Sequence, residues 1–310
     1  MSTIIHDLII IGAGPAGASA AVYAARKKLT TLLLAPEWGG QSVVSENIEN
    51  WIGTPSISGA KLAESFKTHV EKHVGEVLAT ASEYARGISK NDDGTFTVTT
   101  DKAAHCAKSV LVATGSTRRK LEVPGAAQFE NKGVTYCASC DGPLFAGQSV
   151  AVIGGGNAAF ESSAQLMAYC SHVTILQRSD SFRADEVTVE KVLANPTVTG
   201  VLNAKLESIE GDAFVSGLTY STSDGEKVQL PVAGIFVEIG LIPSTDFAKD
   251  IVERNEIGQI VIDPWTQATS VPGIWAAGDC TNVRYHQNNI ASGDGVRALE
   301  DLYMHLKTRV

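Results

Sequence analysis

Two cysteines separated by two residues are the feature of this sequence best suited to chemistry. Cys137 and Cys140 stand in the run Cys-Ala-Ser-Cys-Asp, and Asp141 follows directly. Cysteines with this spacing near a helix N-terminus have a lowered thiol pKa and can alternate between dithiol and disulfide. The Asp141 carboxyl can move the proton that thiol exchange requires. We therefore expect Cys137, Cys140 and Asp141 to be catalytic.

Half of a zinc site is the structural alternative for this pair. A zinc site of this type needs a second pair, and the other three cysteines, Cys106, Cys170 and Cys280, are isolated in apolar or strand-like surroundings. We therefore predict no metal and interpret these three as buried structural thiols. Five cysteines in 310 residues do not make a disulfide framework, which favours a reducing cytoplasm.

The N-terminal segment has the pattern of a dinucleotide-binding turn. An apolar run at 7–11 predicts a strand buried on both faces, and Gly-Ala-Gly-Pro-Ala-Gly follows it directly. The first glycine permits the tight turn, the second lets the backbone approach a pyrophosphate, and the third allows close helix packing. The helix N-terminus then offers free N–H groups to the anion. The candidate residues are Gly12, Gly14, Pro15, Ala16 and Gly17.

A helix at 18–28 and a second buried strand at 31–34 complete a βαβ unit. An acidic residue near the end of that second strand is expected to bind the ribose hydroxyls. Glu37, three residues past the strand, is the only nearby candidate.

The same pattern recurs in the middle of the chain. A strand at 149–153 precedes Gly-Gly-Gly-Asn-Ala-Ala, and a helix to about residue 168 and a strand at 172–176 follow. One such turn serves one dinucleotide, so two turns predict two nucleotides; alternatively, the second domain keeps the fold and binds nothing. The candidate residues are Gly154, Gly156, Asn157, Ala158 and Ala159.

The remaining segments predict how the two βαβ units are joined. Alternation at 95–99 predicts an antiparallel flap, and 109–115 predicts another buried strand. The run at 273–279 predicts a terminal strand that returns to the first sheet, and 293–307 predicts a closing helix. The middle domain is then inserted in the first.

We therefore predict an α/β fold of two Rossmann-like, three-layer (ββα/αβ) nucleotide-binding domains, the second inserted in the first. The discontinuous first domain spans 1–116 and 246–310, and residues 117–245 form the second domain, which carries the dithiol.

Composition narrows the function class. The chain has 34 acidic and 25 basic residues and a formal charge of −9, which argues against a nucleic-acid partner. The uncharged run at 8–25 is interrupted by glycines and a proline and has Asp7 at its start, so we predict neither a signal peptide nor a membrane span.

The chain contains the motifs GAGPAG, GGQ at 39–41, IENW at 48–51, ATGS at 113–116, CASCDG at 137–142, GGGNAA and AAGD at 276–279. Their order and spacing resemble one family from end to end, the low-molecular-weight thioredoxin reductases. The chain is also similar to the reductase core of the alkyl hydroperoxide reductase flavoprotein subunit, and we expect it to lack that subunit's additional N-terminal region because the first glycine turn begins at residue 12.

The resemblance implies a homodimeric disulfide reductase that contains FAD. Electrons would pass from NADPH through FAD and the Cys137–Cys140 pair to thioredoxin or a thioredoxin-like protein disulfide, with Cys140 facing the flavin, Cys137 attacking the substrate and Asp141 as the acid. The further FAD residues that the resemblance implies are Gly39, Gly40, Gln41, Asn50, Ala113, Thr114, Gly115, Gly278, Asp279, His286, Gln287 and Asn288.

Two segments depart from the family pattern. The segment after the second nucleotide strand keeps Arg178 and Arg183 of a longer basic motif, and these two can pair with the NADPH 2′-phosphate or be solvated surface arginines. A related group takes electrons from ferredoxin, and the peroxide-reductase branch uses NADH, so the electron donor stays open. His286 stands where the family has arginine.

Overall fold

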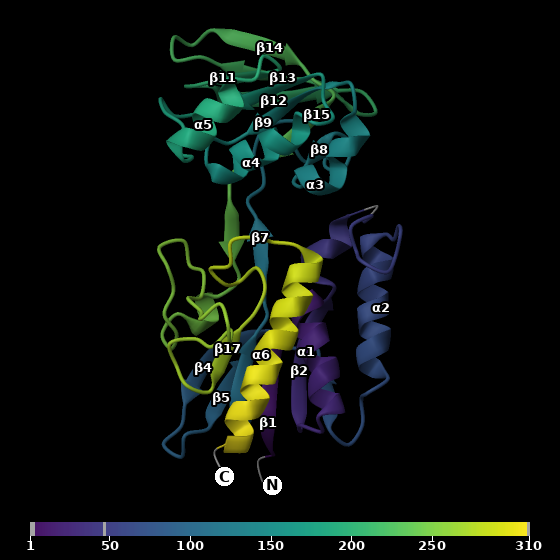
Figure 1. The fold of residues 1–310 in the computed structure, drawn as a ribbon, viewed down its shortest axis with the longest axis vertical. Helices are drawn as coiled ribbons and strands as arrows, with labels where there is room; N and C mark the ends of the chain where they lie inside the picture. The colour runs from purple at the N-terminus through teal and green to yellow at the C-terminus, as the bar shows by residue number, and fades with distance from the viewer. Residues whose placement is uncertain (1–3, 46–47, 309–310) are drawn as a thin grey trace. The chain divides into compact units, whose positions relative to one another are not determined.

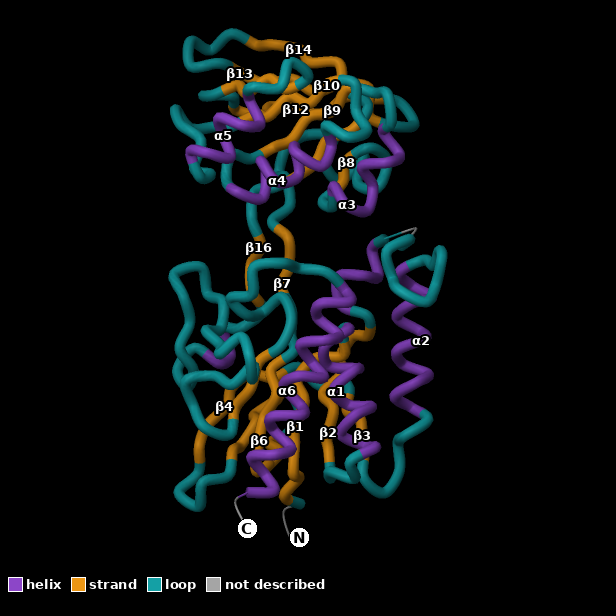
Figure 2. The backbone as a smooth tube through the Cα atoms, in the orientation of Figure 1, coloured by secondary structure: helices purple, strands orange, loops and turns teal. Residues whose placement is uncertain are grey.

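The structure is a computed structural model that describes residues 4–45 and 48–308. It divides into two compact units, one formed by 1–117 with 242–310 and the other by 118–241. The chain passes between them through β7 (Ser116–Arg118) and β16 (Leu241–Pro243), two short strands that pair with each other (Figure 2). Each unit is described by itself below.

The first unit is built on a seven-stranded sheet in the order β3-β2-β1-β6-β5-β4, with β17 paired to β6 (Figure 1). Strands β1, β2, β3, β6 and β17 run parallel, whereas β4 and β5 form the predicted antiparallel flap. The strands are β1 (Ile5–Ala13), β2 (Thr31–Trp38), β3 (Leu78–Ala81), β4 (Ala85–Lys90), β5 (Phe96–Thr100), β6 (Ala104–Val112) and β17 (Ile274–Ala276).

Alternate residues of β1 explain why this sheet is buried on both faces. Leu8 and Ile10 pack with helices α1 (Pro15–Arg26) and α6 (Asn288–Thr308), whereas Ile9 and Ile11 pack with the segment around Ile260 on the other face. Burying one such side chain stabilises the fold by about 1.5–3 kcal/mol, so an uninterrupted apolar run specifies a central strand. Helix α2 (Gly59–Glu71) and the short helices η1 (Gly40–Val44) and η3 (Asp246–Ala248) complete the unit.

The predicted return of the C-terminal segment is confirmed, because β17 pairs in parallel with β6. The predicted start of the closing helix is wrong: α6 begins at Asn288, not at 293. The helix packs closely on α1, since a Cβ on Gly295 would overlap the backbone of Ala16. The predicted end of the second strand is also wrong, because β2 continues to Trp38, beyond residue 34.

The second unit has a five-stranded sheet in the order β11-β10-β9-β15-β8, all parallel, and an antiparallel sheet β12-β13-β14. The strands are β8 (Val134–Thr135), β9 (Ser149–Ile153), β10 (His172–Leu176), β11 (Val198–Val201), β12 (Lys205–Gly211), β13 (Val215–Ser221), β14 (Lys227–Pro231) and β15 (Gly234–Val237). Helices α3 (Ala138–Asp141), η2 (Gly142–Phe145), α4 (Asn157–Leu166) and α5 (Glu186–Leu193) follow its strands.

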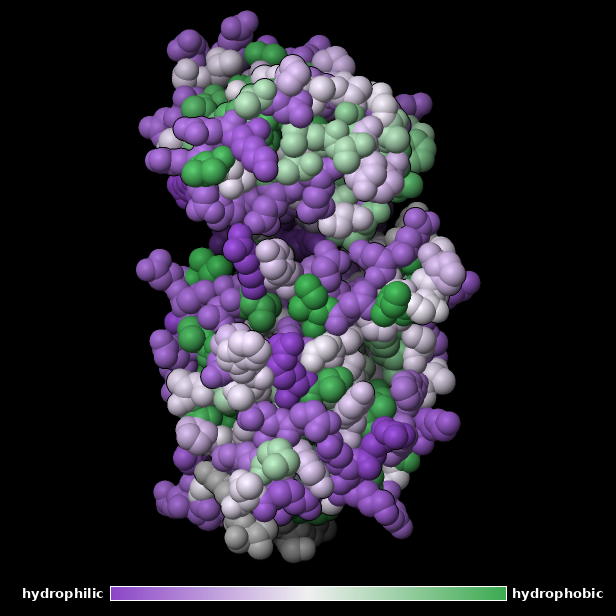
Figure 3. All heavy atoms as spheres, viewed as in Figure 1, coloured by the Kyte–Doolittle hydropathy of each residue, from purple (hydrophilic) through white to green (hydrophobic). Residues whose placement is uncertain are grey.

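Alternation along β9 again separates two cores. Ala151 and Ile153 pack toward the β12-β13-β14 sheet, whereas Val150 and Val152 pack against α4 and α5. The mixed α/β fold with parallel sheets that the sequence predicts is therefore confirmed. On the visible face of the first unit, single hydrophobic residues lie among hydrophilic ones, as on ordinary domain surfaces (Figure 3).

Candidate functional site

The first glycine turn joins β1 to α1, and each of its glycines has a separate role. Gly12 has a φ of +107°, and a Cβ there would overlap the carbonyl of Ala113 on the neighbouring strand. A Cβ on Gly17 would overlap the Gly12 carbonyl, so α1 can approach the turn only with glycine there. Gly14 differs from both, because a Cβ on it would lie 3.9 Å from its nearest neighbour.

Gly14 is the N-cap of α1, Pro15 begins the helix, and no side chain caps its first turn. The first N–H groups of an α-helix have no partner within the helix, so this end presents donors and a partial positive charge. The first turn contains no acidic residue that would repel an anion. The open space at Gly14 thus lies over an end of the helix that suits a phosphate.

The residues that the resemblance implies for FAD converge on this turn from distant segments. Gly39 donates its N–H to Ala13 at 3.0 Å, and the Cα of Gly40 lies 3.9 Å from the Cβ position of Gly14. Gln41 follows in η1. From the C-terminal side, Gly278 has a φ of +76°, and a Cβ there would lie 3.3 Å from the Ala16 side chain.

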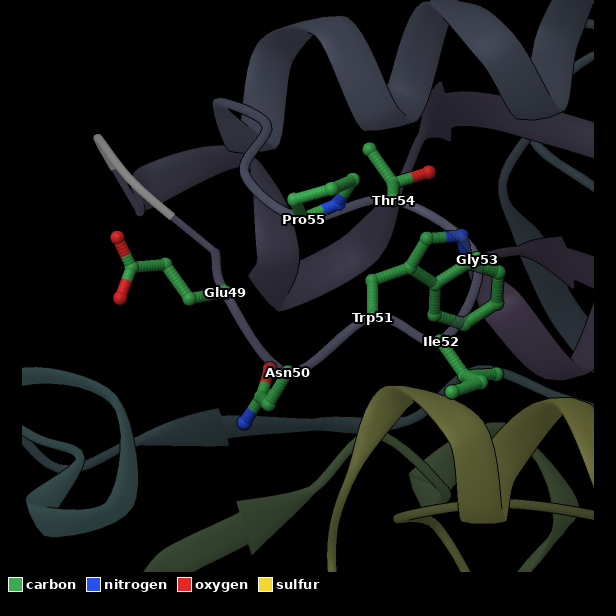
Figure 4. A pocket seen from close by; sticks show the side chains of 7 residues that line it. All are labelled: Glu49, Asn50, Trp51, Ile52, Gly53, Thr54 and Pro55. Carbon is green, nitrogen blue, oxygen red and sulfur yellow. The ribbon is translucent and has the colours of Figure 1, made fainter.

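A loop next to the start of α6 brings two more of them together. Asn50 belongs to the loop around a surface pocket lined by residues 49–55 (Figure 4). Its Nδ2 donates to Gln287 Oε1 at 3.3 Å, and its carbonyl accepts from Asn289 Nδ2 at 2.7 Å. Asn288 Oδ1 accepts from Ser42 Oγ at 2.8 Å. These contacts tie Ser42 and Asn50 to the segment at 287–289.

The other predicted residues of the first unit lie as follows. Glu37 is exposed at the end of β2, and its carboxylate accepts from Tyr84 OH at 2.7 Å. Ala113 and Gly115 flank Thr114, whose hydroxyl donates to the Ser244 carbonyl at 2.7 Å. His286 Nε2 lies 3.2 Å from the carbonyl of Val283, and Asp279 is partly buried. The donor set and the open glycine backbone together fit a dinucleotide such as FAD.

The second glycine turn, in the other unit, repeats this geometry. Gly154 has a φ of +139°, and a Cβ there would overlap the carbonyl of Glu238, just past β15. Gly156 is the N-cap of α4, again without a side-chain cap, and nothing lies within 4 Å of its Cβ position. Ala158 is exposed and Ala159 is buried in the first turn of α4.

The segment that follows β10 lies against this turn. Arg183 donates its N–H to the Gly155 carbonyl at 2.6 Å, and Asp185 donates its own to Asn157 Oδ1 at 2.8 Å. Gln177, directly after β10, is buried over Gly155 and donates to the Ser181 carbonyl at 3.2 Å. Arg178 and Arg183 are exposed, and neither forms an ion pair with a described residue.

The two cysteines of the Cys-x-x-Cys motif form a disulfide, with their Cα atoms 5.3 Å apart. Cys137 is the N-cap of α3, which is a single turn that continues into η2. The other three cysteines are free, and Cys170 and Cys280 are buried as predicted, whereas Cys106 is only partly buried. Within the described ranges no group of three acidic, histidine or cysteine side chains is arranged to hold a metal ion.

Asp141 lies directly beside the disulfide. Its Oδ2 accepts a hydrogen bond from Thr135 Oγ1 on β8. Burial raises the pKa of Asp141, while the Thr135 hydrogen bond and the charge of Arg118 act in the opposite direction. A carboxyl that keeps its proton to higher pH than usual is suited to donate one to a leaving thiolate.

Comparison with known proteins assigns the family. A family model described as pyridine nucleotide-disulphide oxidoreductase matches residues 6–295. The chain belongs to this family. Its fold is that of the thioredoxin reductases, and its family implies a flavin and a nicotinamide nucleotide.

Solved structures of thioredoxin reductases share this fold over nearly the whole chain. The enzyme from Streptococcus pyogenes superposes with a TM-score of 0.88 and 34% identity, covering 99% of this chain and 100% of that one. The enzyme from Giardia duodenalis has a TM-score of 0.91 and 30% identity, covering 97% and 99%. Two Rossmann-like nucleotide-binding domains, as predicted, are therefore confirmed.

Some longer proteins are more similar in sequence to this chain than these two thioredoxin reductases are. An NADH dehydrogenase of Bacillus subtilis is 42% identical over 294 residues, covering 94% of this chain and 57% of the relative. The F subunit of alkyl hydroperoxide reductase in Escherichia coli is 42% identical over 296 residues, with the same coverage. The chain thus spans a little over half the length of these curated relatives. No described helix is long and apolar enough to cross a membrane.

Sequence reasoning missed one acidic residue of this oxidoreductase. Glu238 directly follows β15 at the edge of the sheet where the second glycine turn lies, and its Oε1 accepts from Ser162 Oγ on α4 at 2.6 Å. Burial raises the pKa of Glu238, and the Ser162 hydrogen bond opposes that rise. In the sequence it stands in an apolar run, and only its position at the carboxyl end of a predicted strand could have identified it.

Proposed function

We propose that this oxidoreductase takes electrons from NADPH and reduces the disulfide of thioredoxin or a thioredoxin-like protein. The observation that carries the proposal is the Cys137–Cys140 disulfide beside a half-buried acid, in the same unit as the second glycine turn. The thioredoxin reductase structures that share the fold support it.

The residues proposed to bind FAD lie in the first unit, and the dithiol and its acid lie in the second. The open N-terminus of α1 at Gly14 would hold the FAD pyrophosphate, with Gln41, Asn50 and Gln287 around it. Bound FAD supplies the chemistry that joins hydride transfer from the nicotinamide to reduction of a disulfide. Cys137 attacks the substrate disulfide, and Asp141 holds the proton that the leaving thiolate needs.

Two arginines support NADPH as the donor. Backbone hydrogen bonds from Arg183 and Asp185 hold the segment after β10 against the glycine turn. Arg178 and Arg183 are both exposed in this segment, and guanidinium groups bind phosphate strongly. The residue directly after β10 is Gln177, so no carboxylate there repels a 2′-phosphate.

Anaerobic mixing with NADPH and, separately, with NADH tests the donor through bleaching of the flavin absorbance. We expect NADPH to bleach the flavin faster. Arg178→Ala and Arg183→Ala should each raise the Kd for NADPH about tenfold or more, since a hydrogen bond to a charged group contributes roughly 1.5–3 kcal/mol, and should leave the Kd for NADH unchanged. Arg26→Ala, an exposed arginine of the first unit, is the matched control. Equal losses with both nucleotides would refute the phosphate site.

The names of the longer relatives favour a second candidate, an NADH-dependent reductase that serves a peroxiredoxin system. Bleaching by NADH alone, together with reduction of a peroxiredoxin-type partner in place of thioredoxin, would establish it. Bleaching by neither nucleotide but by reduced ferredoxin would instead establish the ferredoxin-dependent alternative. The homodimer stays a prediction, which sedimentation of the flavin-loaded protein checks.

A further inference from the structure

Thr135 is a buried polar residue to which neither the sequence pattern nor the family gives a role. It is 7% exposed and stands in β8, where it pairs with Phe236 of β15. Its hydroxyl donates to Asp141 Oδ2 and lies 3.4 Å from the N–H of Cys137, which donates to it. One hydroxyl therefore connects the backbone of one cysteine to the neighbouring acid.

Few other groups of the described chain act on the Asp141 carboxyl. Arg118 of β7 is the charged one, and it also lies over the Tyr136 ring at 5.9 Å. The charge of Arg118 also acts on Glu238, which directly follows β15, the strand next to β8. Of Thr135, Arg118 and Glu238, Thr135 is the one with a hydrogen bond to the Asp141 carboxylate. Its hydroxyl is therefore the group best placed to orient that carboxylate.

We propose that Thr135 is a positioning residue that aims the Asp141 carboxyl at the dithiol and sets how readily it gives up its proton during exchange with an alkyl disulfide. This inference rests on the proposed function, since it assigns a proton to the disulfide exchange described above. It adds a residue that touches neither the substrate nor the cysteine sulfurs.

The exchange balances with one proton from Asp141. In the reduced state Cys137 is a thiolate, Cys140 is a thiol and Asp141 is protonated. The Cys137 sulfur attacks one sulfur of the substrate, the substrate S–S bond breaks, and the leaving thiolate takes the Asp141 proton. The Cys140 sulfur then attacks Cys137, its proton passes to the second substrate sulfur, and the enzyme disulfide forms again. The dithiol is oxidised and the substrate is reduced by two electrons.

The hydroxyl matters in this step because it stabilises the carboxylate that the step creates. Thr135→Val keeps nearly the same shape but removes the donor, so Asp141 would lose its proton less readily. Because the missing hydrogen bond had lowered the pKa of Asp141, the alkaline limb of the pH–rate profile should move upward by about one pH unit. At pH values below this alkaline limb, the rate of reaction with an alkyl disulfide should fall about tenfold.

The test compares two disulfides whose leaving groups differ. Flavin-loaded protein is reduced with dithiothreitol, freed of it, and mixed with either 2-hydroxyethyl disulfide or 5,5′-dithiobis(2-nitrobenzoate). The aryl thiolate released from the second reagent is stable without a proton and needs no acid. Free thiols at Cys137 and Cys140 are counted by alkylation and mass spectrometry, and the aryl thiolate by its absorbance.

We expect Thr135→Val to slow the alkyl disulfide about tenfold and the aryl disulfide less than about twofold, with Thr135→Ser within about twofold of wild type for both. Asp141→Asn should show the same selectivity, and the double variant should lose no more than Asp141→Asn alone. If Thr135→Val fails to fold, Thr135→Ala provides the same comparison.

Equal losses with both disulfides would show only a packing defect and overturn the inference, as would no loss with either. These outcomes differ from failure of the proposed function. In that case the reduced wild-type protein would leave the disulfide of thioredoxin intact, whatever residue stands at 135, although its dithiol would still react with both reagents.

Discussion

Gly14 and Gly17 offer a sharp test of the flavin site because a methyl group has opposite consequences at the two positions. At Gly17 the added Cβ would overlap the Gly12 carbonyl, so α1 must shift away from β1. Forced overpacking of this kind typically costs about 1–3 kcal/mol. At Gly14 the Cβ would meet nothing closer than 3.9 Å, and its φ of −74° suits any residue.

We therefore expect Gly14→Ala to change the stability of the flavin-free protein by less than about 1 kcal/mol, the effect of an N-cap change. The methyl would nevertheless occupy the place where backbone must approach the pyrophosphate. Losing one charge-assisted hydrogen bond costs roughly 1.5–3 kcal/mol, so the Kd for FAD should rise about tenfold to a hundredfold. Gly17→Ala should instead lower the free energy of unfolding of the flavin-free protein, by about 1–3 kcal/mol.

The assay measures thermal unfolding of the flavin-free proteins by circular dichroism and FAD affinity by quenching of flavin fluorescence. Gly156→Ala, which places a methyl in equally open space at the N-cap of α4, is the matched control and should leave FAD affinity unchanged. Wild-type FAD affinity in Gly14→Ala would refute our assignment of the pyrophosphate to this turn. A flavin-free Gly14→Ala protein as unstable as Gly17→Ala would refute the packing argument.

Two further predictions concern the second unit. Cys140→Ser should keep its bound flavin and its reduction by the nucleotide but lose protein-disulfide turnover; unchanged turnover would show that the dithiol is not the reductant. Glu238→Gln should raise the midpoint of thermal unfolding at about pH 8 but not at about pH 4. Burial raises the pKa of Glu238 in the folded protein, so its carboxylate lowers the free energy of unfolding at pH values where this group is ionised. At about pH 4 the folded protein holds Glu238 neutral, as glutamine is. Glu226→Gln, an exposed carboxyl, is the control, and a gain that is equal at both pH values would contradict the reasoning.

The central strands and both glycine turns could be predicted because their signals are local. An apolar run such as 8–11 is typical of a strand covered on both faces, and the glycines that follow it mark the turn. The predicted strands at 149–153 and 172–176 match β9 and β10 residue for residue. Where the local pattern is this strong, the secondary structure can be predicted without knowledge of distant contacts.

The errors arose where distant contacts decide the local structure. The closing helix was predicted to begin at 293, yet α6 begins at Asn288 and packs closely on Ala16 of α1 through Gly295. Thr135 and Glu238 could not be assigned for the same reason. Their importance comes from Asp141 and from Ser162, which are neighbours only in the folded unit.

The two glycine turns together bear on whether the second one still binds a nucleotide. Gly12 and Gly154 both have positive φ, and a Cβ on either would strike a carbonyl from the adjacent strand. The third position differs, because Gly17 is in tight contact with its turn whereas α4 leaves room for a buried Ala159.

At the position that faces a pyrophosphate the two turns agree. Gly14 and Gly156 are both uncapped N-caps with open space where a side chain would be. A turn kept only for the fold would need the strained first glycine and the packed third position, but it would gain nothing from open backbone at the second. The open N-cap of α4 therefore favours a second nucleotide over an empty domain, and with it a nicotinamide donor over an iron–sulfur protein.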